Sequence, residues 1–95
     1  MYESRRSQIA RAILEYLHRN PEAQDTVAGI AQWWLPEAKI KARTAIVKEA
    51  LTELVGEGLI LERQAKDFQT HYRLNLRSRK RIERMLKRQP EDSEA

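Results

Sequence analysis

The stretch from Arg43 to Arg63, RTAIVKEALTELVGEGLILER, constrains the fold more than any other part of this chain. Its apolar residues recur at three- and four-residue steps, which places them on one side of an α-helix. They are Ile46, Val47, Ala50, Leu51, Leu54 and Val55. Gly56 and especially Gly58 fit the end of that helix, because glycine readily adopts the positive φ that ends the hydrogen-bond ladder. The apolar residues 59–61 then favour a strand. We therefore expect a buried helix, from about residue 43 to 57, that leads directly into a β-strand.

The length of 95 residues fits one domain with a small core, and we expect residues 1–89 to form it. The chain has no cysteine, which excludes disulfides, thiolate metal sites and a nucleophilic thiol. It has no apolar run of about 20 residues, the length that spans a bilayer, and its first residues lack a secretory signal. We therefore expect a soluble cytoplasmic protein, without a metal or a cofactor.

The charges are distributed unevenly. Eighteen Lys and Arg face fourteen Asp and Glu, which gives a net charge of +4. Three of the acids, Glu91, Asp92 and Glu94, lie in a C-terminal segment, residues 90–95, that we expect to be a disordered acidic tail. Seven cations lie within residues 77–88. Such a density attracts phosphate polymers or other acidic surfaces, and a solvated helix face is the alternative interpretation.

Two helices are predicted before the central segment. The first runs from about residue 3 to 18, capped by Ser4, with an apolar stripe on one side. The stripe consists of Ile9, Ile13, Leu14 and Leu17. The second helix begins near Asp25 or Thr26 and stops at Pro36. Because Trp33 and Trp34 are adjacent in this helix, only one of them can point into the core.

A hairpin and a last helix are predicted after the central segment. The strands span about Leu59 to Gln64 and Thr70 to Asn75, and the five-residue loop between them suits a hairpin. Asn75 could cap a basic helix from about residue 77 to 89. Its narrow apolar stripe is Ile82, Met85 and Leu86. This helix could pack on the first helix, pair with a second copy, or lie along an acidic polymer.

Helix, short β element, helix, turn, helix and hairpin is the order of elements in a winged helix-turn-helix domain. The segment ARTAIVKEALTELVGEGLILER is similar to the recognition helix and first wing strand of GntR-type and MarR-like bacterial repressors, in which V-[KR]-x-A-L precedes a Gly-Leu step. TVAGIAQWWL resembles their second helix. The matching residues are Val47, Lys48, Ala50, Leu51, Gly58 and Leu59. The resemblance covers about residues 3–76. It implies an α+β, mostly helical fold with a three-helix core and a two-stranded wing, to which this chain adds a C-terminal helix.

Two features depart from the family pattern. The connector formed by residues 36–42 is longer than the usual turn of three or four residues, so the resemblance does not fix the crossing angle of the two helices. The exposed side of the third helix also carries Glu49, Glu53 and Glu57, which would repel phosphates. Only the first turns of this helix therefore suit contact with DNA.

The resemblance implies that the start of the third helix enters the major groove. The candidate residues there are Lys39, Lys41, Arg43, Thr44, Ala45 and Lys48. Arg43 could read guanine or hold a phosphate, Thr44 could contact a base or a phosphate, and Ala45 could touch only a thymine methyl. In the competing interpretation Thr44 is the helix N-cap and Arg43 a solvent-exposed flank.

The wing supplies further cationic candidates, spaced so that several could line one side of a β-ribbon and reach phosphates or the minor groove. They are Arg63, Lys66, His71 and Arg73. We expect His71 to be an ordinary strand histidine, although contact with a phosphate would let it titrate near neutrality. Phe68 could be an exposed wedge, but we expect it to fold back onto the hairpin, as loop aromatics more often do.

The last helix adds possible contacts to phosphates or to a partner. These are Arg77, Lys80, Arg81 and Arg84. Since paired half-sites need paired recognition helices, the resemblance also implies a homodimer. An enzyme is not expected: the two histidines, His18 and His71, lie far apart, and no Gly-rich phosphate loop, HExxH or acidic calcium loop is present.

These features lead to three hypotheses. The first is a transcriptional regulator that binds double-stranded DNA, either sequence-specifically or architecturally. The second is a protein-interaction module that holds an acidic partner through the basic last helix, Phe68 or the tryptophan left outside the core. The third and weakest is RNA binding by the arginine-rich last helix.

Overall fold

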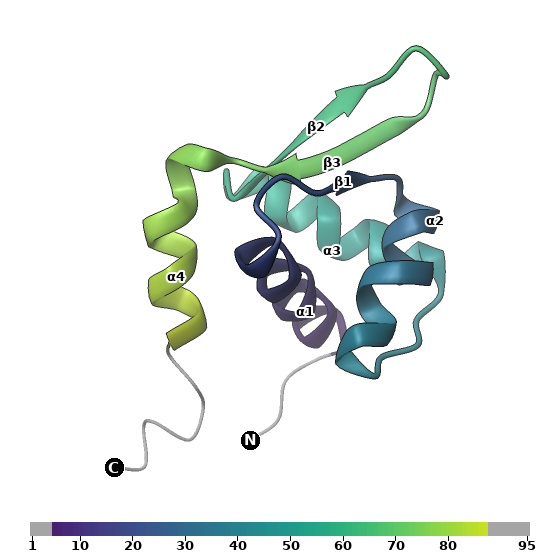
Figure 1. Ribbon diagram of the computed structural model, residues 1–95. Coiled ribbons are helices and arrows are strands. Elements are labelled where there is room, and N and C mark those ends of the chain that lie inside the picture. Colours follow the sequence, from purple (N-terminus) through teal and green to yellow (C-terminus); the bar gives the residue numbers. More distant parts are fainter. Residues whose placement is uncertain (1–4, 88–95) are drawn as a thin grey trace.

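A computed structural model describes residues 5–87, which form a mostly helical α+β fold with a small antiparallel sheet (Figure 1). The helices are α1 (Arg5–Arg19), α2 (Val27–Gly29), α3 (Thr44–Gly56) and α4 (Arg79–Lys87). The strands are β1 (Gln24–Asp25), β2 (Ile60–Gln64) and β3 (Thr70–Leu74). The coarse prediction of a mostly helical α+β domain is confirmed. The expected start of the first helix with its Ser4 cap, the end of the last helix and the acidic tail at 90–95 lie outside the described residues.

The helix that begins with α2 continues further than predicted. Thr26 is its N-cap, and the Thr26 hydroxyl accepts a hydrogen bond from the Gly29 amide at 3.1 Å. A π-helical turn (Ile30–Trp34) and a 3-10 turn (Leu35–Ala38) follow. The prediction that Pro36 stops the helix is wrong. Pro36 lies in the first turn of the 3-10 segment. The first backbone N–H groups of such a segment have no acceptor within it, so the N–H that proline lacks costs the 3-10 turn no hydrogen bond. The helical run ends instead at Lys39, which adopts a left-handed φ of 60°.

The two tryptophans face different environments, as the sequence requires. Trp34 is buried and its ring stacks on that of Tyr16, with a centroid distance of 4.6 Å. Trp33 is 63% exposed. The stacked pair fastens the second helical segment to α1, whose predicted apolar stripe is buried.

Helix α3 ends as the glycines predict. Gly58 has a φ of +78°, its amide donates to the Val55 carbonyl, and the Leu59 amide donates to the Leu54 carbonyl. This pair of bonds is a Schellman motif, which satisfies carbonyls at the end of the helix. Both Leu54 and Leu59 are buried, so the same turn joins the helix to the core and starts the strand.

The sheet has three strands, in the order β1-β3-β2: the two strands of the predicted hairpin and a short strand between α1 and α2, to which no residues had been assigned from the sequence. Strands β2 and β3 pair antiparallel from Ile60 opposite Leu74 to Gln64 opposite Thr70, around the expected five-residue loop. The additional strand β1 pairs with β3. Two residues are too few to show the alternation by which a strand is recognised in sequence. Backbone pairing with β3 makes this segment a strand.

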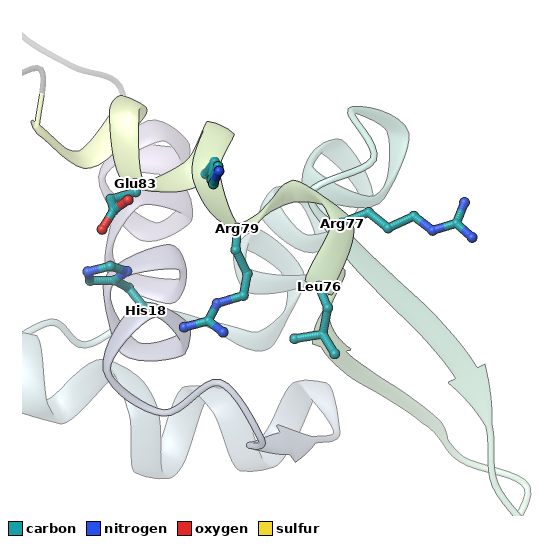
Figure 2. A pocket seen from close by; sticks show the side chains of 6 residues that line it. His18, Leu76, Arg77, Arg79 and Glu83 are labelled. Atoms are coloured by element: carbon teal, nitrogen blue, oxygen red, sulfur yellow. The ribbon is translucent and has the colours of Figure 1, made fainter.

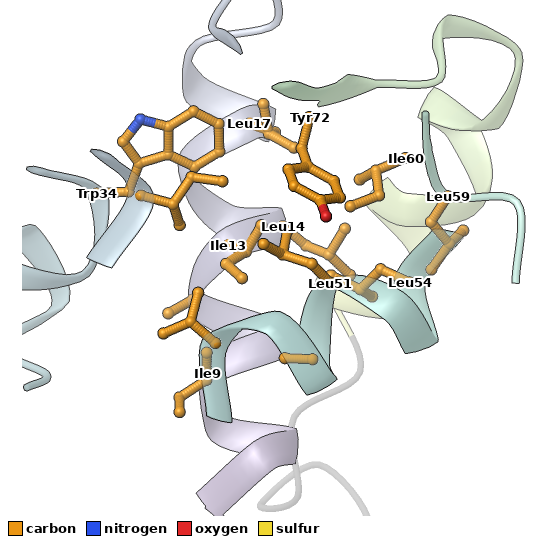
Figure 3. Close-up of a cluster of buried hydrophobic side chains, with 14 of the residues drawn as sticks. Ile9, Ile13, Leu14, Leu17, Trp34, Leu51, Leu54, Leu59, Ile60 and Tyr72 are labelled. Atoms are coloured by element: carbon orange, nitrogen blue, oxygen red, sulfur yellow. The ribbon is translucent and has the colours of Figure 1, made fainter. Parts of the chain in front are cut away.

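One continuous core lies between the helices and one face of the sheet (Figure 3). Ile60, Tyr72 and Leu74 point from the sheet toward α1 and α3, because residues two apart on a strand share a face. We call this side the inner face. The opposite side, which we call the outer face, therefore carries the intervening residues. They are Leu61 and Arg63 of β2, and His71 and Arg73 of β3.

Helix α4 packs on α1 in the same chain, one of the three arrangements open from sequence. Ile82 is buried, and Met85 and Leu86 pack at the edge of the core. The Arg11 guanidinium donates to the Leu86 carbonyl at 2.9 Å. Asn75 caps the 3-10 turn (Leu76–Ser78) that precedes α4, and so the α-helix begins two residues later than predicted.

Candidate nucleic-acid interface

The start of α3 is open to solvent. Arg43 occupies the N-cap position with extended backbone, and its side chain makes no capping hydrogen bond. The first turn contains no acidic residue. Unpaired amides and the helix dipole together make such a terminus favourable for an anion. The competing interpretation, in which Thr44 is the N-cap, is wrong, because Thr44 already belongs to the helix.

All the candidates predicted around this terminus are exposed. They are Lys39, Lys41, Arg43, Thr44, Ala45 and Lys48. Arg5 joins them, because its guanidinium donates to the Lys41 carbonyl. Sequence reasoning did not include Arg5, since nothing local in the sequence connects it to a residue 36 positions away. This set of residues is called the α3 entry below.

The acidic residues lie further along α3. Glu49 is exposed, and Glu53 forms an ion pair with Arg6 of α1 at 3.2 Å. Glu57 lies at the C-cap, where its carbonyl accepts a hydrogen bond from Arg81 at 3.0 Å. The acids therefore occupy the middle and end of the helix, and its first turn, which contains no charged residue, lies between Arg43 and Lys48.

The hairpin candidates gather on the outer face of the sheet. Arg63 lies directly opposite His71, and Arg73 lies between Leu61 on β2 and Gln24 on β1. The expectation that several cations line one side of the ribbon is therefore met. That side faces away from α3, because Tyr72 and Leu74 occupy the inner face. The apolar alternation of β3 could have revealed this orientation in the sequence.

Three shallow grooves connect these cations to the start of α4. A groove of about 310 Å³ at the hairpin is lined by Gln24, Arg63, Lys66 and His71, among others. A second of about 480 Å³ shares Gln24 and Arg63 and adds Arg73, Leu76 and Arg79. A third of about 450 Å³ shares Leu76 and Arg79 and extends to His18, Lys80 and Glu83 (Figure 2). Gln24 was not predicted as a site residue, and Arg79 was named only among the cations of the last helix, since only the fold brings β1 and α4 beside the hairpin.

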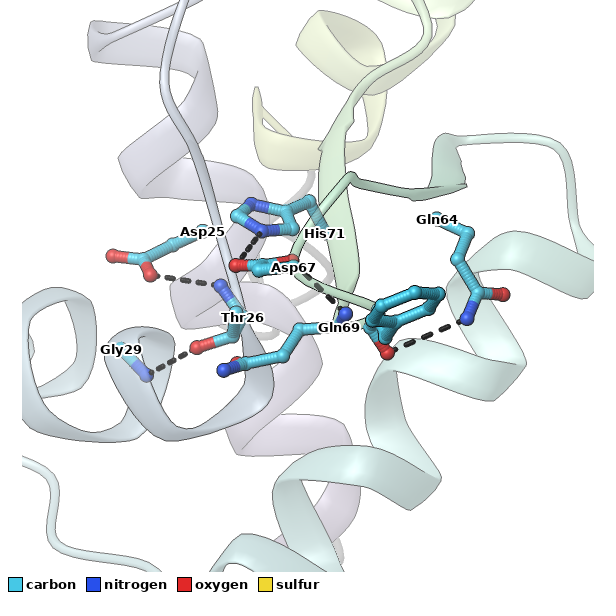
Figure 4. A network of polar contacts seen from close by, with 8 residues as sticks. Asp25, Thr26, Gly29, Gln64, Asp67, Gln69 and His71 are labelled. Carbon is cyan, nitrogen blue, oxygen red and sulfur yellow. Dashed lines mark hydrogen bonds and ion pairs between the residues drawn. The ribbon is translucent and has the colours of Figure 1, made fainter.

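The loop at the tip of the hairpin holds Phe68 out in solvent. Phe68 is 85% exposed and has a left-handed φ of 65°, so the expectation that it folds back onto the hairpin is wrong. The Phe68 amide donates to the Ala65 carbonyl. The Gln64 side chain donates to the Phe68 carbonyl, the bond drawn from Gln64 in Figure 4. These two hydrogen bonds hold the backbone of the loop at Phe68, whose ring lies in solvent.

His71 contacts Asp67 within the same hairpin. Its Nε2 lies 3.5 Å from Oδ2 of Asp67, an ion-pair distance when the imidazole is protonated (Figure 4). A hydrogen bond from the Gln69 amide, with a smaller contribution from His71, lowers the pKa of Asp67 below its ordinary value of 3.8. The half-buried His71 is therefore engaged inside the hairpin.

The candidate residues thus form two separate surfaces. One is the α3 entry, and the other consists of the outer face of the sheet and the cations of the last helix. The α3 entry lies near the end of the α2 segment, whereas α4 lies beside the C-terminal end of α3 (Figure 1). A helix of 13 residues is about 20 Å long. The exposed side chains of Arg77, Lys80, Arg81 and Arg84 are therefore far from the α3 entry.

Three arginines of α1 form ion pairs, whereas the lysines and arginines of the α3 entry and the outer face do not do so within the described residues. On α1, Arg6, Arg11 and Arg19 pair with Glu53, Glu15 and Glu37. Within residues 5–87, no ion pair involves a lysine or arginine of the α3 entry or of the outer face. Those charges remain open to an external anion.

Other kinds of site find less support in the structure. In the described part of the chain, no group of three or more His, Asp or Glu side chains is placed to hold a metal ion. Across the same residues, no helix has the length and apolar character needed to cross a membrane. No protein-family model, curated protein or solved structure matches this chain.

Proposed function

We propose that this protein is a winged-helix regulator that binds double-stranded DNA, with the α3 entry in the major groove and the tip of the β2–β3 wing on the backbone or in the minor groove. One observation carries the proposal: the start of α3 is exposed and uncapped, and several cations without ion pairs surround it. The order of elements, three helices followed by a hairpin, supports the same proposal.

The chemistry of the α3 entry favours positioning over extensive base reading. Arg43 is the side chain best suited to a guanine edge, and Thr44 and Lys48 suit phosphates or a single base contact. Ala45 offers only a methyl contact. Binding should therefore depend strongly on salt: if about six phosphates are neutralised, the logarithm of affinity falls with the logarithm of salt concentration at a slope near −5.

The proposal is tested by fluorescence anisotropy with labelled duplexes over a salt series. The variant Arg43→Gln/Lys48→Gln should weaken binding by about tenfold or more at low salt. It should also make the salt dependence of the affinity shallower, with the slope changing from about −5 to about −3. The control Arg84→Gln/Lys87→Gln removes the same charge from exposed positions at the far end of α4. Equal losses in both variants would show nonspecific attraction only. A wild-type protein that binds no duplex at low salt would rule the function out.

A homodimer on paired half-sites is part of this proposal, because two recognition helices would then meet two half-sites. Helix α4 already uses Ile82 against its own chain, so pairing of copies would use a different surface. Light scattering of the protein with and without a duplex measures the mass. A single copy per duplex at all concentrations would remove the dimer but leave DNA binding intact.

The exposure of Trp33 keeps one alternative function open. An aromatic ring that is 63% exposed, on a protein with a basic helix, also suits an acidic protein partner. Titration with a polyglutamate peptide distinguishes the two functions. A protein-interaction module would bind the peptide at least as tightly as duplex DNA at equal salt, and Trp33→Ala would weaken that binding. A DNA-binding protein would show the opposite preference.

A further inference from the structure

The outer face of the sheet carries a run of cations that the α3 entry does not include. We call it the outer-face tract: Arg63 and Arg73 on the strands, and Arg79 and Lys80 at the α4 end. Neighbouring grooves share Arg63 and Arg79, so the three grooves form one path across the surface. Figure 2 shows Arg79 extending between His18 and Leu76 at the α4 end of this path.

The charge of the tract is not neutralised from within the described chain. Among residues 5–87, the ion pairs involve other cations, chiefly those of α1. Two acids line the same grooves, Glu22 in the middle groove and Glu83 in the groove at the α4 end, so the cations still outnumber the acids. An extended surface with this excess of positive charge fits an extended anion.

The position of the tract separates it from the α3 entry. Arg63 and Arg73 project from the face of the sheet opposite to the one packed on α3. A duplex seated on the α3 entry, at the start of a helix that packs on the inner face, would therefore leave the outer face to another ligand. Two anionic ligands can occupy the protein at the same time.

The side chains of the tract favour the backbone of a duplex over a single strand. Unpaired bases are held by stacking on aromatic rings, and among residues 5–87 no Phe, Tyr or Trp lines any of the three grooves. Tyr72, the aromatic residue of β3, points into the core. Arginine and lysine on an open surface instead suit phosphate oxygens without reading sequence.

We infer that the outer-face tract binds the phosphate backbone of a second DNA duplex, so that one copy of the protein holds two duplex segments together. This inference rests on the proposed function for its first duplex and adds a second binding surface. The protein would then bring DNA segments together in addition to occupying a site.

Bridging is measured with an immobilised unlabelled duplex that is loaded with full-length protein, washed and exposed to a fluorescent duplex. Wild-type protein should capture the second duplex. The variant Arg63→Gln/Arg73→Gln should reduce capture by about tenfold while its affinity for one duplex, measured by anisotropy, changes no more than about twofold. The control Arg84→Gln/Lys87→Gln, with the same loss of charge, should capture as the wild type does. Each variant is first checked for an unchanged unfolding midpoint.

Four outcomes would overturn the inference. If Arg63→Gln/Arg73→Gln captures normally, bridging comes from paired copies through their α3 entries. If this variant loses single-duplex affinity as strongly as Arg43→Gln/Lys48→Gln does, the two surfaces belong to one site. If wild-type protein binds one duplex but captures no second, the tract has another role, and the proposed function stands. If wild-type protein binds no duplex at all, the proposed function fails together with the inference.

Discussion

Alternating residues of the same strands give the small sheet a buried apolar face and an exposed cationic face. On the inner face, Ile60, Tyr72 and Leu74 are almost completely buried against the helices. On the outer face, Leu61 is 38% exposed and Arg63 and Arg73 lie in solvent. Burial of apolar area stabilises the fold, and exposed charges contribute little to it. The inner face therefore holds the hairpin in place, and the outer face is free to bind.

The largest expected difference is between neighbouring positions on β2. Ile60→Ala removes a fully buried side chain and should lower the free energy of unfolding by about 2–5 kcal/mol. Leu61→Ala removes a partly exposed side chain and should lower it by less than about 1 kcal/mol. Urea denaturation followed by circular dichroism measures both. Equal losses would mean that the outer face is also part of a packed interface.

A second, smaller effect concerns the turn that sets which side chains face inward. Gly58 has a φ of +78° and open space around its missing Cβ, so Gly58→Ala meets only the cost of the left-handed backbone. That cost is about 1–2 kcal/mol. Gly56 also has open space but is the last residue of α3. Gly56→Ala should therefore stabilise the protein, by up to about 1 kcal/mol. Thermal unfolding of the two variants should shift in opposite directions, and a shared direction would contradict this account.

Features that depend on neighbouring residues could be predicted from the sequence. The glycine at position 58 and the adjacency of Trp33 and Trp34 each carry a local physical constraint, and the corresponding features were predicted. The alternation of Tyr72 and Leu74 carries one too, but the inward face of β3 was not predicted from it. The short β element implied by the resemblance could not be located, because Gln24 and Asp25 become a strand only through pairing with β3.

The errors have a common physical origin. Pro36 stays within a helical run because the π-helical and 3-10 turns around it accommodate its ring, and this arrangement has no local signature. The candidate residues fell on two surfaces, the α3 entry and the outer face of the sheet. Residue spacing shows which side chains share one side of a hairpin, but it does not show which helices pack against the other side. Arg79 entered the tract only through the packing of α4 on α1.

An alkaline titration sharpens the account of the inner face. Burial, with a smaller contribution from Glu62, raises the pKa of Tyr72 above its ordinary value of 10.0. The phenol therefore ionises more readily in the unfolded chain than in the folded protein. Its contribution to stability is complete below pH 10.0 and is lost as the pH rises through the raised pKa.

The free energy of unfolding should accordingly fall above pH 10, and Tyr72→Phe should make that fall less steep. Tyr16→Phe, whose ring lies in the stack with Trp34, is the matched control. Chemical denaturation at a series of alkaline pH values measures the slopes. If Tyr72→Phe leaves the fall of the unfolding free energy with pH unchanged, water reaches the Tyr72 hydroxyl and burial does not raise its pKa.

The smallest expected change in stability lies at the loop where the two faces end. Phe68 has a left-handed backbone, which asparagine tolerates better than phenylalanine does. Its exposed ring contributes little packing, so Phe68→Asn should leave stability unchanged or raise it by up to about 1 kcal/mol. A strained, exposed aromatic is maintained more readily for binding than for folding. On the proposed function, the same substitution should weaken duplex binding severalfold while Gln69→Asn, at the next exposed position of the loop, does not. A variant that gains stability and keeps full affinity would show that the tip of the hairpin takes no part in recognition, and would leave the α3 entry and the outer-face tract as the surfaces to test.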